Sequence, residues 1–243
     1  MGYQLEICAF NLASAIVAQG AGADRIELCA SPSEGGVTPS PGTIRSAREH
    51  LRVALYPIIR PRGGDFLYSD EEFRVMLRDI DYCKQMGCNG VVIGMLNADG
   101  SVDQARCARL VEAAYPLGVT FHRAFDWAAN PFEALETIIQ MGCERILTSG
   151  QRSTAEEGAA LIDQLVREAD DRIVIMPGSG VNSANIVLLA EKTGASEFHT
   201  SARLRLASAM EYVNASMKED QDLVMAGEDE IKKIKEQLLS LAG

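Results

Sequence analysis

The stretch Val-Thr-Phe-His-Arg-Ala-Phe-Asp at residues 119–126 decides the fold, because a run typical of a buried strand leads directly into reactive side chains. Its first residues are β-branched or aromatic, and His122, Arg123 and Asp126 fall at or just past the carboxyl end of the predicted strand. Residues 130–133, Asn-Pro-Phe-Glu, then open a helix with an N-cap, a proline at the first helical position and a glutamate placed for a capping box. α/β proteins build their sites at such strand-to-helix turns, although a single histidine there can also have a purely structural role.

The same strand-and-helix pattern recurs along the chain. Helical patterns separate nearly all of eight predicted strands, which are residues 3–8, 25–29, 53–60, 90–94, 119–124, 145–149, 172–176 and 197–201. A glycine that can take the left-handed C′ conformation stands just before several of these strands, at positions 22, 87, 142 and 194. Capping patterns predict further helix starts at Ser40-Pro41, at Ser69 with Glu72, and at Ser101 with Gln104.

Eight such units without a linker predict a (β/α)8 TIM-like barrel, as one domain over residues 1–243. The alternative is a doubly wound sheet, but no G-x-G-x-x-G follows the first predicted strand. An irregular, polar stretch follows Ser201, and a last helix with one apolar face is expected over residues 228–241.

Composition and charge narrow the classes of function. The 34 acidic and 23 basic residues give a formal net charge of −11, which disfavours nucleic acid and anionic membranes as partners. No stretch approaches the roughly 20 apolar residues of a membrane span, so we expect a cytoplasmic protein. Six cysteines in 243 residues, without a CxxC pair, do not predict a disulfide scaffold. We also expect a homo-oligomer.

The first two predicted strands end alike, in Glu6-Ile7-Cys8 and Glu27-Leu28-Cys29. The strand period of two places each glutamate on the same face as its cysteine, and a charged side chain is better placed inside the barrel than against the helices. Two thiols and two carboxylates are therefore expected on adjacent strands about 5 Å apart. A soft thiolate pair suits Cu(I), with Met95 as a possible neighbour, but buried packing or a disulfide are alternatives for the same spacing.

Other strand ends carry groups that suit an anion. Arg60 and Arg62 flank a proline before a Gly-Gly pair, and they either bind an anionic ligand or neutralise Glu6 and Glu27. The Gly-Ser-Gly loop at residues 178–180 follows the seventh strand, where barrels often hold phosphate. The expected anion site comprises Arg60, Arg62, Arg123, Asp126, Ser149, Gly178, Gly180, His199 and Ser201.

Several motifs, taken in order, resemble the CutC family of copper homeostasis proteins over about residues 3–203. They are Ala-Asp-Arg-Ile-Glu-Leu-Cys at 23–29, Glu-Gly-Gly at 34–36, Ile-Arg-Pro-Arg-Gly-Gly-Asp-Phe at 59–66, Phe-His-Arg-Ala-Phe-Asp at 121–126, Leu-Thr-Ser-Gly at 147–150 and Phe-His at 198–199. The tail beyond Arg203 matches less well. The resemblance implies a TIM-like barrel, a cytoplasmic location, a role in handling copper, and Cys8 and Cys29 as Cu(I) ligands.

Two hypotheses of different class follow, with a copper ion or a small anionic ligand as the partner. In the first, the protein binds and handles Cu(I) through Cys8 and Cys29. In the second, it is a barrel enzyme acting on a small anionic or phosphorylated substrate. His122 would then be the general acid/base, with Glu6 or Glu27 as its carboxylate partner and Arg60 and Arg62 as an anion clamp.

Overall fold

The computed structural model describes residues 2–214, 216–218 and 220–242, and in them eight parallel strands alternate with helices along the chain. The strands are β1 (Gln4–Ala9), β2 (Arg25–Leu28), β3 (Ala54–Pro57), β4 (Gly90–Ile93), β5 (Gly118–Phe121), β6 (Arg145–Thr148), β7 (Val174–Pro177) and β8 (Glu197–Thr200). The helices are α1 (Leu12–Gly20), α2 (Pro41–His50), α3 (Asp70–Gln85), α4 (Gln104–Ala114), α5 (Pro131–Met141), α6 (Ala159–Ala169), α7 (Ile186–Thr193) and α8 (Glu228–Ala242). The 3₁₀ turns are η1 (Pro32–Glu34) and η2 (Arg123–Trp127).

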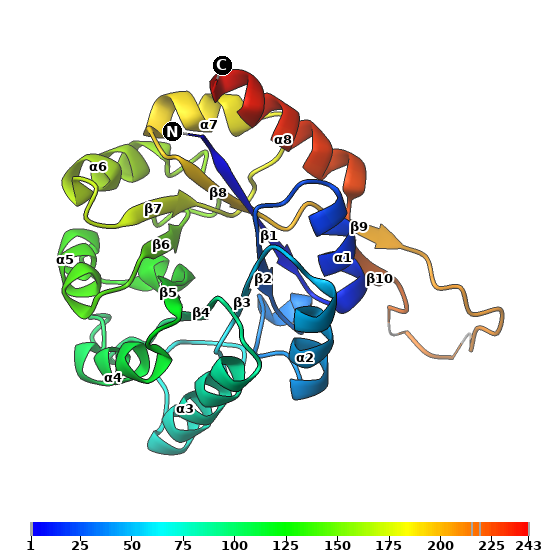
Figure 1. Ribbon diagram of the computed structural model, residues 1–243, viewed down its shortest axis with the longest axis horizontal. Coiled ribbons are helices and arrows are strands. Elements are labelled where there is room, and N and C mark those ends of the chain that lie inside the picture. Colours follow the sequence, from blue (N-terminus) through cyan, green and yellow to red (C-terminus); the bar gives the residue numbers. More distant parts are fainter. Residues whose placement is uncertain (1, 215, 219, 243) are drawn as a thin grey trace.

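The strands form a ring with the helices around it (Figure 1). Hydrogen-bonded ladders run in the order β3-β2-β1-β8 and β4-β5-β6-β7. A parallel bridge between Ile58 and Val92 joins β3 to β4, and β7 lies beside β8. The expected (β/α)8 TIM-like barrel is confirmed, and each predicted strand lies within a few residues of its observed position.

Period-two alternation along the strands separates two apolar regions. Leu5, Ile7 and Ile26 face outward and belong to the large cluster that packs against the helices. Cys8, Cys29, Tyr56, Ile58 and Val92 form a separate small cluster on the inner face. Polar side chains share this inner face. The carboxyl ends of the strands form the barrel mouth, which is where barrels place their functional side chains.

Side-chain caps explain most of the helix starts. Ser69 forms the expected capping box with Glu72, and Ser40 and Asn130 cap the helices that begin at the following prolines. The expected start at Ser101 is wrong. Asp103 caps α4 instead, by accepting from the backbone N–H of Arg106 at 3.1 Å.

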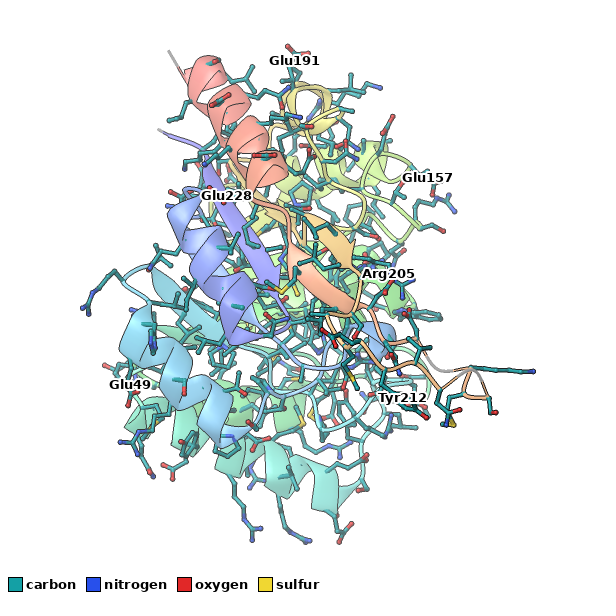
Figure 2. The ribbon with its side chains drawn as sticks, turned by 90° about the vertical axis from the view of Figure 1, so that its right-hand side faces the viewer. Glu49, Glu157, Glu191, Arg205, Tyr212 and Glu228 are labelled. Carbon is teal, nitrogen blue, oxygen red and sulfur yellow. The ribbon has the colours of Figure 1, made fainter. Side chains whose placement is uncertain are left out.

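The stretch after Ser201 is more ordered than expected. Its two arms, β9 (Arg203–Leu206) and β10 (Leu223–Ala226), pair as an antiparallel hairpin that projects from the barrel beside α1 (Figure 1). Figure 2 shows this segment with Arg205 and Tyr212 labelled, and Glu228 where β10 passes into α8. No helix among the described residues is long and apolar enough to cross a membrane.

Candidate functional site at the barrel mouth

The barrel mouth holds a cavity of about 1090 Å³. Parts of its wall come from the ends of β1, β2 and β8, and others from the ends of β3 and β5. The hairpin and the start of α8 complete it. Of the residues expected from the sequence, those that line the cavity are Cys8, Glu27, Arg60, His122, Arg123, Gly180, His199 and Ser201.

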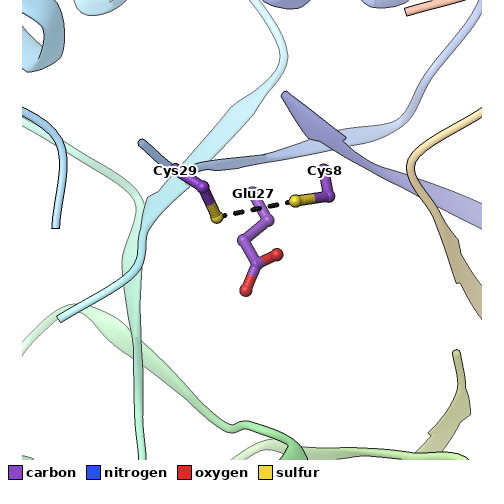
Figure 3. A group of neighbouring side chains, drawn as sticks. All are labelled: Cys8, Glu27 and Cys29. Atoms are coloured by element: carbon purple, nitrogen blue, oxygen red, sulfur yellow. Dashed lines mark hydrogen bonds between the residues drawn. The ribbon is translucent and has the colours of Figure 1, made fainter. Parts of the chain in front are cut away.

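Two buried thiols meet at the ends of β1 and β2. The sulfurs of Cys8 and Cys29 lie 3.5 Å apart and are hydrogen-bonded, and both cysteines are reduced. The Glu27 carboxyl lies beside them (Figure 3), with ligand atoms of all three residues within 4.8 Å of one another. A Cβ at Gly36 would lie 3.2 Å from the Cys29 sulfur, so only glycine lets the loop after β2 pack this closely over the thiols.

The two thiols differ in acidity because they share one proton. The hydrogen bond from Cys29 lowers the pKa of Cys8 to about 5, with help from His199 and against the effect of burial. Burial raises the pKa of Cys29 well above its usual value, and its bond to Cys8 raises it further. At neutral pH the pair is one thiolate and one thiol.

His199 lies between the carboxyl groups of Glu6 on β1 and Glu27 on β2. Its Nδ1 lies 2.7 Å from Glu6, and its Nε2 lies 3.7 Å from Glu27. Burial would lower the pKa of His199, but its bonds to Cys8 and Glu6 and the charge of Glu27 raise it well above 6.5. The expected pairing of His122 with Glu6 or Glu27 is therefore wrong, since both carboxyl groups lie against His199.

A network of charges forms the floor beneath the cavity. Arg25 is paired with Glu6 and lies 2.6 Å from Glu197, which also accepts from Arg145 at 3.1 Å. Burial would raise the pKa of Glu6, but the charge of Arg25 and the hydrogen bond of His199 lower it to about 2. Burial raises the pKa of Glu27 well above 4.5, and the charge of Cys8 raises it further. Glu6 is thus a carboxylate held below the cavity, whereas burial in the cavity wall favours the neutral form of Glu27.

The two arginines at the end of β3 point to different places. Arg60 is buried, and its guanidinium donates to the backbone carbonyls of Glu34, Gly36 and Gly64 at 2.7–2.8 Å. Arg62 faces outward, where it pairs with Asp65 and Glu72. They form no common clamp, and they do not neutralise Glu6 and Glu27, because Arg25 is the partner of Glu6.

His122 is 3% exposed, and the backbone N–H of Ala124 donates to its Nδ1 at 3.1 Å. Burial and, less strongly, the charge of Arg60 lower the pKa of His122 to about 3, so the ring is neutral and carries its proton on Nε2. Nδ1 already accepts a hydrogen bond and Nε2 carries the proton, so this tautomer suits the acid part of the expected acid/base role better than the base part. The geometry makes His122 a hydrogen-bond donor.

Asp126 and Ser149 position Arg123 at the rim of the cavity. Arg123 donates to the Asp126 carboxylate at 2.7 Å and to the Ser149 hydroxyl at 2.9 Å. Asp126 in turn accepts from the backbone N–H and the hydroxyl of Ser149. Within this group, Arg123 is the member that lines the cavity.

The glycine-rich loop after β7 has a packing role. A Cβ at Gly178 would lie 2.4 Å from a methyl group of Leu147, so a larger residue here would have to displace that buried side chain. Just beyond, the backbone N–H and hydroxyl of Ser183 donate to Glu230 at 2.6 and 2.9 Å. A carboxylate of the chain itself thus occupies two donors just before α7, and phosphate binding by residues 178–180 remains a prediction.

Comparison with known proteins shows the family. The CutC family model matches residues 3–204. A CutC family protein of Chromobacterium violaceum is 54% identical over 208 residues, covering 86% of this chain and 84% of that protein. One from Bacteroides thetaiotaomicron is 51% identical over 216 residues, covering 88% of this chain and 87% of that protein. The chain belongs to the CutC family.

Solved structures agree with this assignment. CutC from Streptococcus agalactiae, to which a role in copper homeostasis has been attributed, superposes with a TM-score of 0.79 at 32% identity, covering 82% of this chain and 98% of that one. Phosphoribosylanthranilate isomerase from Thermotoga maritima superposes with a TM-score of 0.60 at 15% identity, covering 98% of this chain and 99% of that one. The second likeness shows the fold alone.

Three buried charges of this CutC family protein were missed by reasoning from the sequence. Arg25, Arg145 and Glu197 open their strands and complete the floor of the site. The signal was available at Arg25, because it lies two residues before Glu27 and so shares its inward face.

Proposed function

We propose that this CutC family protein binds Cu(I) through Cys8 and Cys29 at the barrel mouth. The observation that carries the proposal is the buried pair of reduced sulfurs 3.5 Å apart, one of which is a thiolate at neutral pH. Soft thiolates favour Cu(I) over hard cations. The role in copper homeostasis attributed to the S. agalactiae relative supports the same ion.

The charge of the site suits a monovalent ion. The sulfurs share one proton, and Cu(I) would take the place of that proton while leaving the charge of the pair at minus one. The raised pKa of His199 favours its protonated form, which offsets this single charge from beside Cys8. A divalent ion would add a positive charge next to His199 and Arg25, so electrostatics select against Zn²⁺ at the same sulfurs.

Reduced thiols also fit the expected compartment. Cys8 and Cys29 act as ligands only while they are not joined as a disulfide, and a cytoplasm keeps thiols reduced. We therefore propose that copper handling takes place there. The enzyme alternative has less support, because Nδ1 of His122 already accepts a hydrogen bond from the backbone of Ala124.

Substitution of both sulfur ligands tests the proposal. We expect Cys8→Ser/Cys29→Ser to abolish stoichiometric Cu(I) binding, because a serine hydroxyl is a hard, poor donor for Cu(I). The measurement is anaerobic competition with a chromophoric Cu(I) chelator. Cys83→Ser/Cys143→Ser is the matched control, since it also removes two buried thiols but should keep one equivalent bound. Tight binding retained by the Cys8/Cys29 variant would refute the assignment of these ligands.

A further inference from the structure

His122 carries a buried donor that the protein does not satisfy. Its Nδ1 accepts from Ala124, which places the ring proton on Nε2. No acceptor among the described residues reaches Nε2. An unmatched buried donor destabilises the folded state, so a strand-end histidine in this state points to an acceptor supplied from outside the chain.

Arg60 places a full positive charge in the same part of the wall. It is 6% exposed, its partners are backbone carbonyls, and no carboxylate of the described residues forms an ion pair with it. Its Nε also lacks a partner, but the unpaired hydroxyl of Tyr68 lies close enough to interact with the guanidinium. The charge of Arg60, and not its Nε donor, is therefore what attracts an anion to this part of the cavity.

Phe66 connects these two groups. Its ring lies 5.0 Å from the His122 ring and 5.0 Å from the Arg60 guanidinium, and all three residues line the cavity. An aromatic wall excludes water from around the donor and the charge. Both then interact more strongly with an anionic group than they would in solvent.

The mouth favours a carboxylate over a phosphate. One arginine without an ion pair and one neutral imidazole N–H match the single charge and two oxygens of a carboxylate. On the side where a barrel would hold phosphate, the cavity is lined by Glu228, Asp229 and Glu230 and also by Arg203 and Lys233, so acidic side chains outnumber basic ones and disfavour a dianion. The rest of the lining includes apolar side chains, among them Phe10, Ile58 and Leu147.

We propose that the mouth cavity binds a small organic acid, whose carboxylate accepts the Nε2 proton of His122 and is held by the charge of Arg60. Arg123 also lines the cavity at its rim, but its charge is paired with Asp126. The proposed acid and the proposed copper ion use different residues of the same cavity, His122 and Arg60 for the acid and Cys8 and Cys29 for copper, so each proposal can be tested by its own substitutions.

The test uses acetate, propionate, malonate, succinate and benzoate, each compared with its amide and with chloride at matched ionic strength. At least one acid should raise the melting temperature saturably, because a ligand of the folded state stabilises it, while its amide and chloride should not. His122→Phe, which keeps the ring volume but deletes the donor, should weaken that affinity about tenfold or more. Cys8→Ser/Cys29→Ser should keep it.

Arg60→Met and Arg62→Met form a matched pair, because only the first removes a charge that faces the cavity. Only Arg60→Met should weaken binding. If Arg60→Met fails to fold, imidazole ¹⁵N spectra of the unaltered protein test whether the acid binds at His122. The chain has 3 histidines, and the signal that disappears in His122→Phe belongs to His122. The acid should shift the Nε2 resonance of His122. The proposal is overturned if no acid exceeds chloride, or if a bound acid leaves that resonance unmoved.

Discussion

His122 and His199 both point inward from strand ends, yet their surroundings shift the two pKa values in opposite directions. The pKa of His199 is raised well above 6.5 despite burial, because Cys8, Glu6 and Glu27 surround it. The pKa of His122 is lowered to about 3 by burial and by Arg60. Side chains within a few ångströms, and not position along a strand, therefore decide which histidine pairs with the thiolate and which serves as a neutral donor.

The state of His122 predicts how stability depends on pH. Its folded pKa of about 3 lies below its ordinary value of 6.5, so the unfolded chain takes up the proton first. The resulting stability is present above pH 6.5 and is lost as the pH falls toward 3, at about 1.4 kcal/mol per pH unit. Urea unfolding measures the unfolding free energy of the unaltered protein and of His122→Gln at each pH. The value for the unaltered protein minus that for the variant should fall by roughly 2–3 kcal/mol between pH 7 and pH 4.5.

The exposed His50 provides the control for this experiment. His50→Gln should give nearly the same difference from the unaltered protein at both pH values. If His122→Gln also shows a difference that does not depend on pH, His122 is not buried in its neutral form, and the tautomer argument loses its basis.

At the scale of elements, the hairpin of β9 and β10 is attached to the barrel through the cap of α1. Asn11 accepts from the backbone N–H of Ser14 at 2.8 Å and donates to the carbonyl of Val224 at 2.9 Å. One side chain thus caps a helix and fixes an arm of the cavity wall. The outer hairpin exposes large apolar side chains such as Tyr212 and Val213. The expected homo-oligomer remains a prediction.

Two substitutions of Asn11 separate these roles. Asn11→Ala should lower the unfolding free energy by about 1–2 kcal/mol, because both the cap and the hairpin bond are lost. Asn11→Asp keeps an acceptor for Ser14 but has no N–H for Val224, so it should mainly speed amide exchange in β9 and β10. Ser40→Ala, which removes only the cap of α2, should leave that exchange unchanged. Hairpin exchange at the original rate in Asn11→Asp would show that this bond does not hold the hairpin.

At the scale of the whole molecule, the barrel encloses charged side chains as well as apolar ones. Arg25 and Arg145 on β2 and β6 meet Glu6 and Glu197 on β1 and β8 inside the ring. Because strands from both halves of the chain contribute, the network is complete only when the barrel has closed. It also sets the charge of Glu6, and through Glu6 the orientation of His199.

Removal of one arginine tests how much this network contributes. Arg25→Met should lower the unfolding free energy by about 3–5 kcal/mol, because Glu6 and Glu197 lose their shared buried partner. Arg172→Met breaks an exposed pair with Glu136, which solvent screens, and should change the unfolding free energy far less. Both values come from urea unfolding at pH 7. Equal losses in the two variants would mean that the floor charges are solvated.

The sequence by itself determined the repeating units and the faces of the strands. Strand period and helix caps are local properties, so they predicted the (β/α)8 barrel and placed Cys8, Glu27 and Cys29 on inward faces. The family motifs lie on those same strand ends, which is why the CutC family could be identified from the residues alone.

Only the tertiary structure decided which groups meet. Glu6 and His199 are 193 positions apart and touch because β1 pairs with β8 when the ring closes, so no local pattern could choose between His199 and His122. Arg60 and Arg62 look equivalent in sequence, yet the loop after β3 turns one inward and the other out to Glu72. Local periodicity fixes which way a side chain faces, whereas its partner and its pKa depend on the side chains that other strands bring beside it.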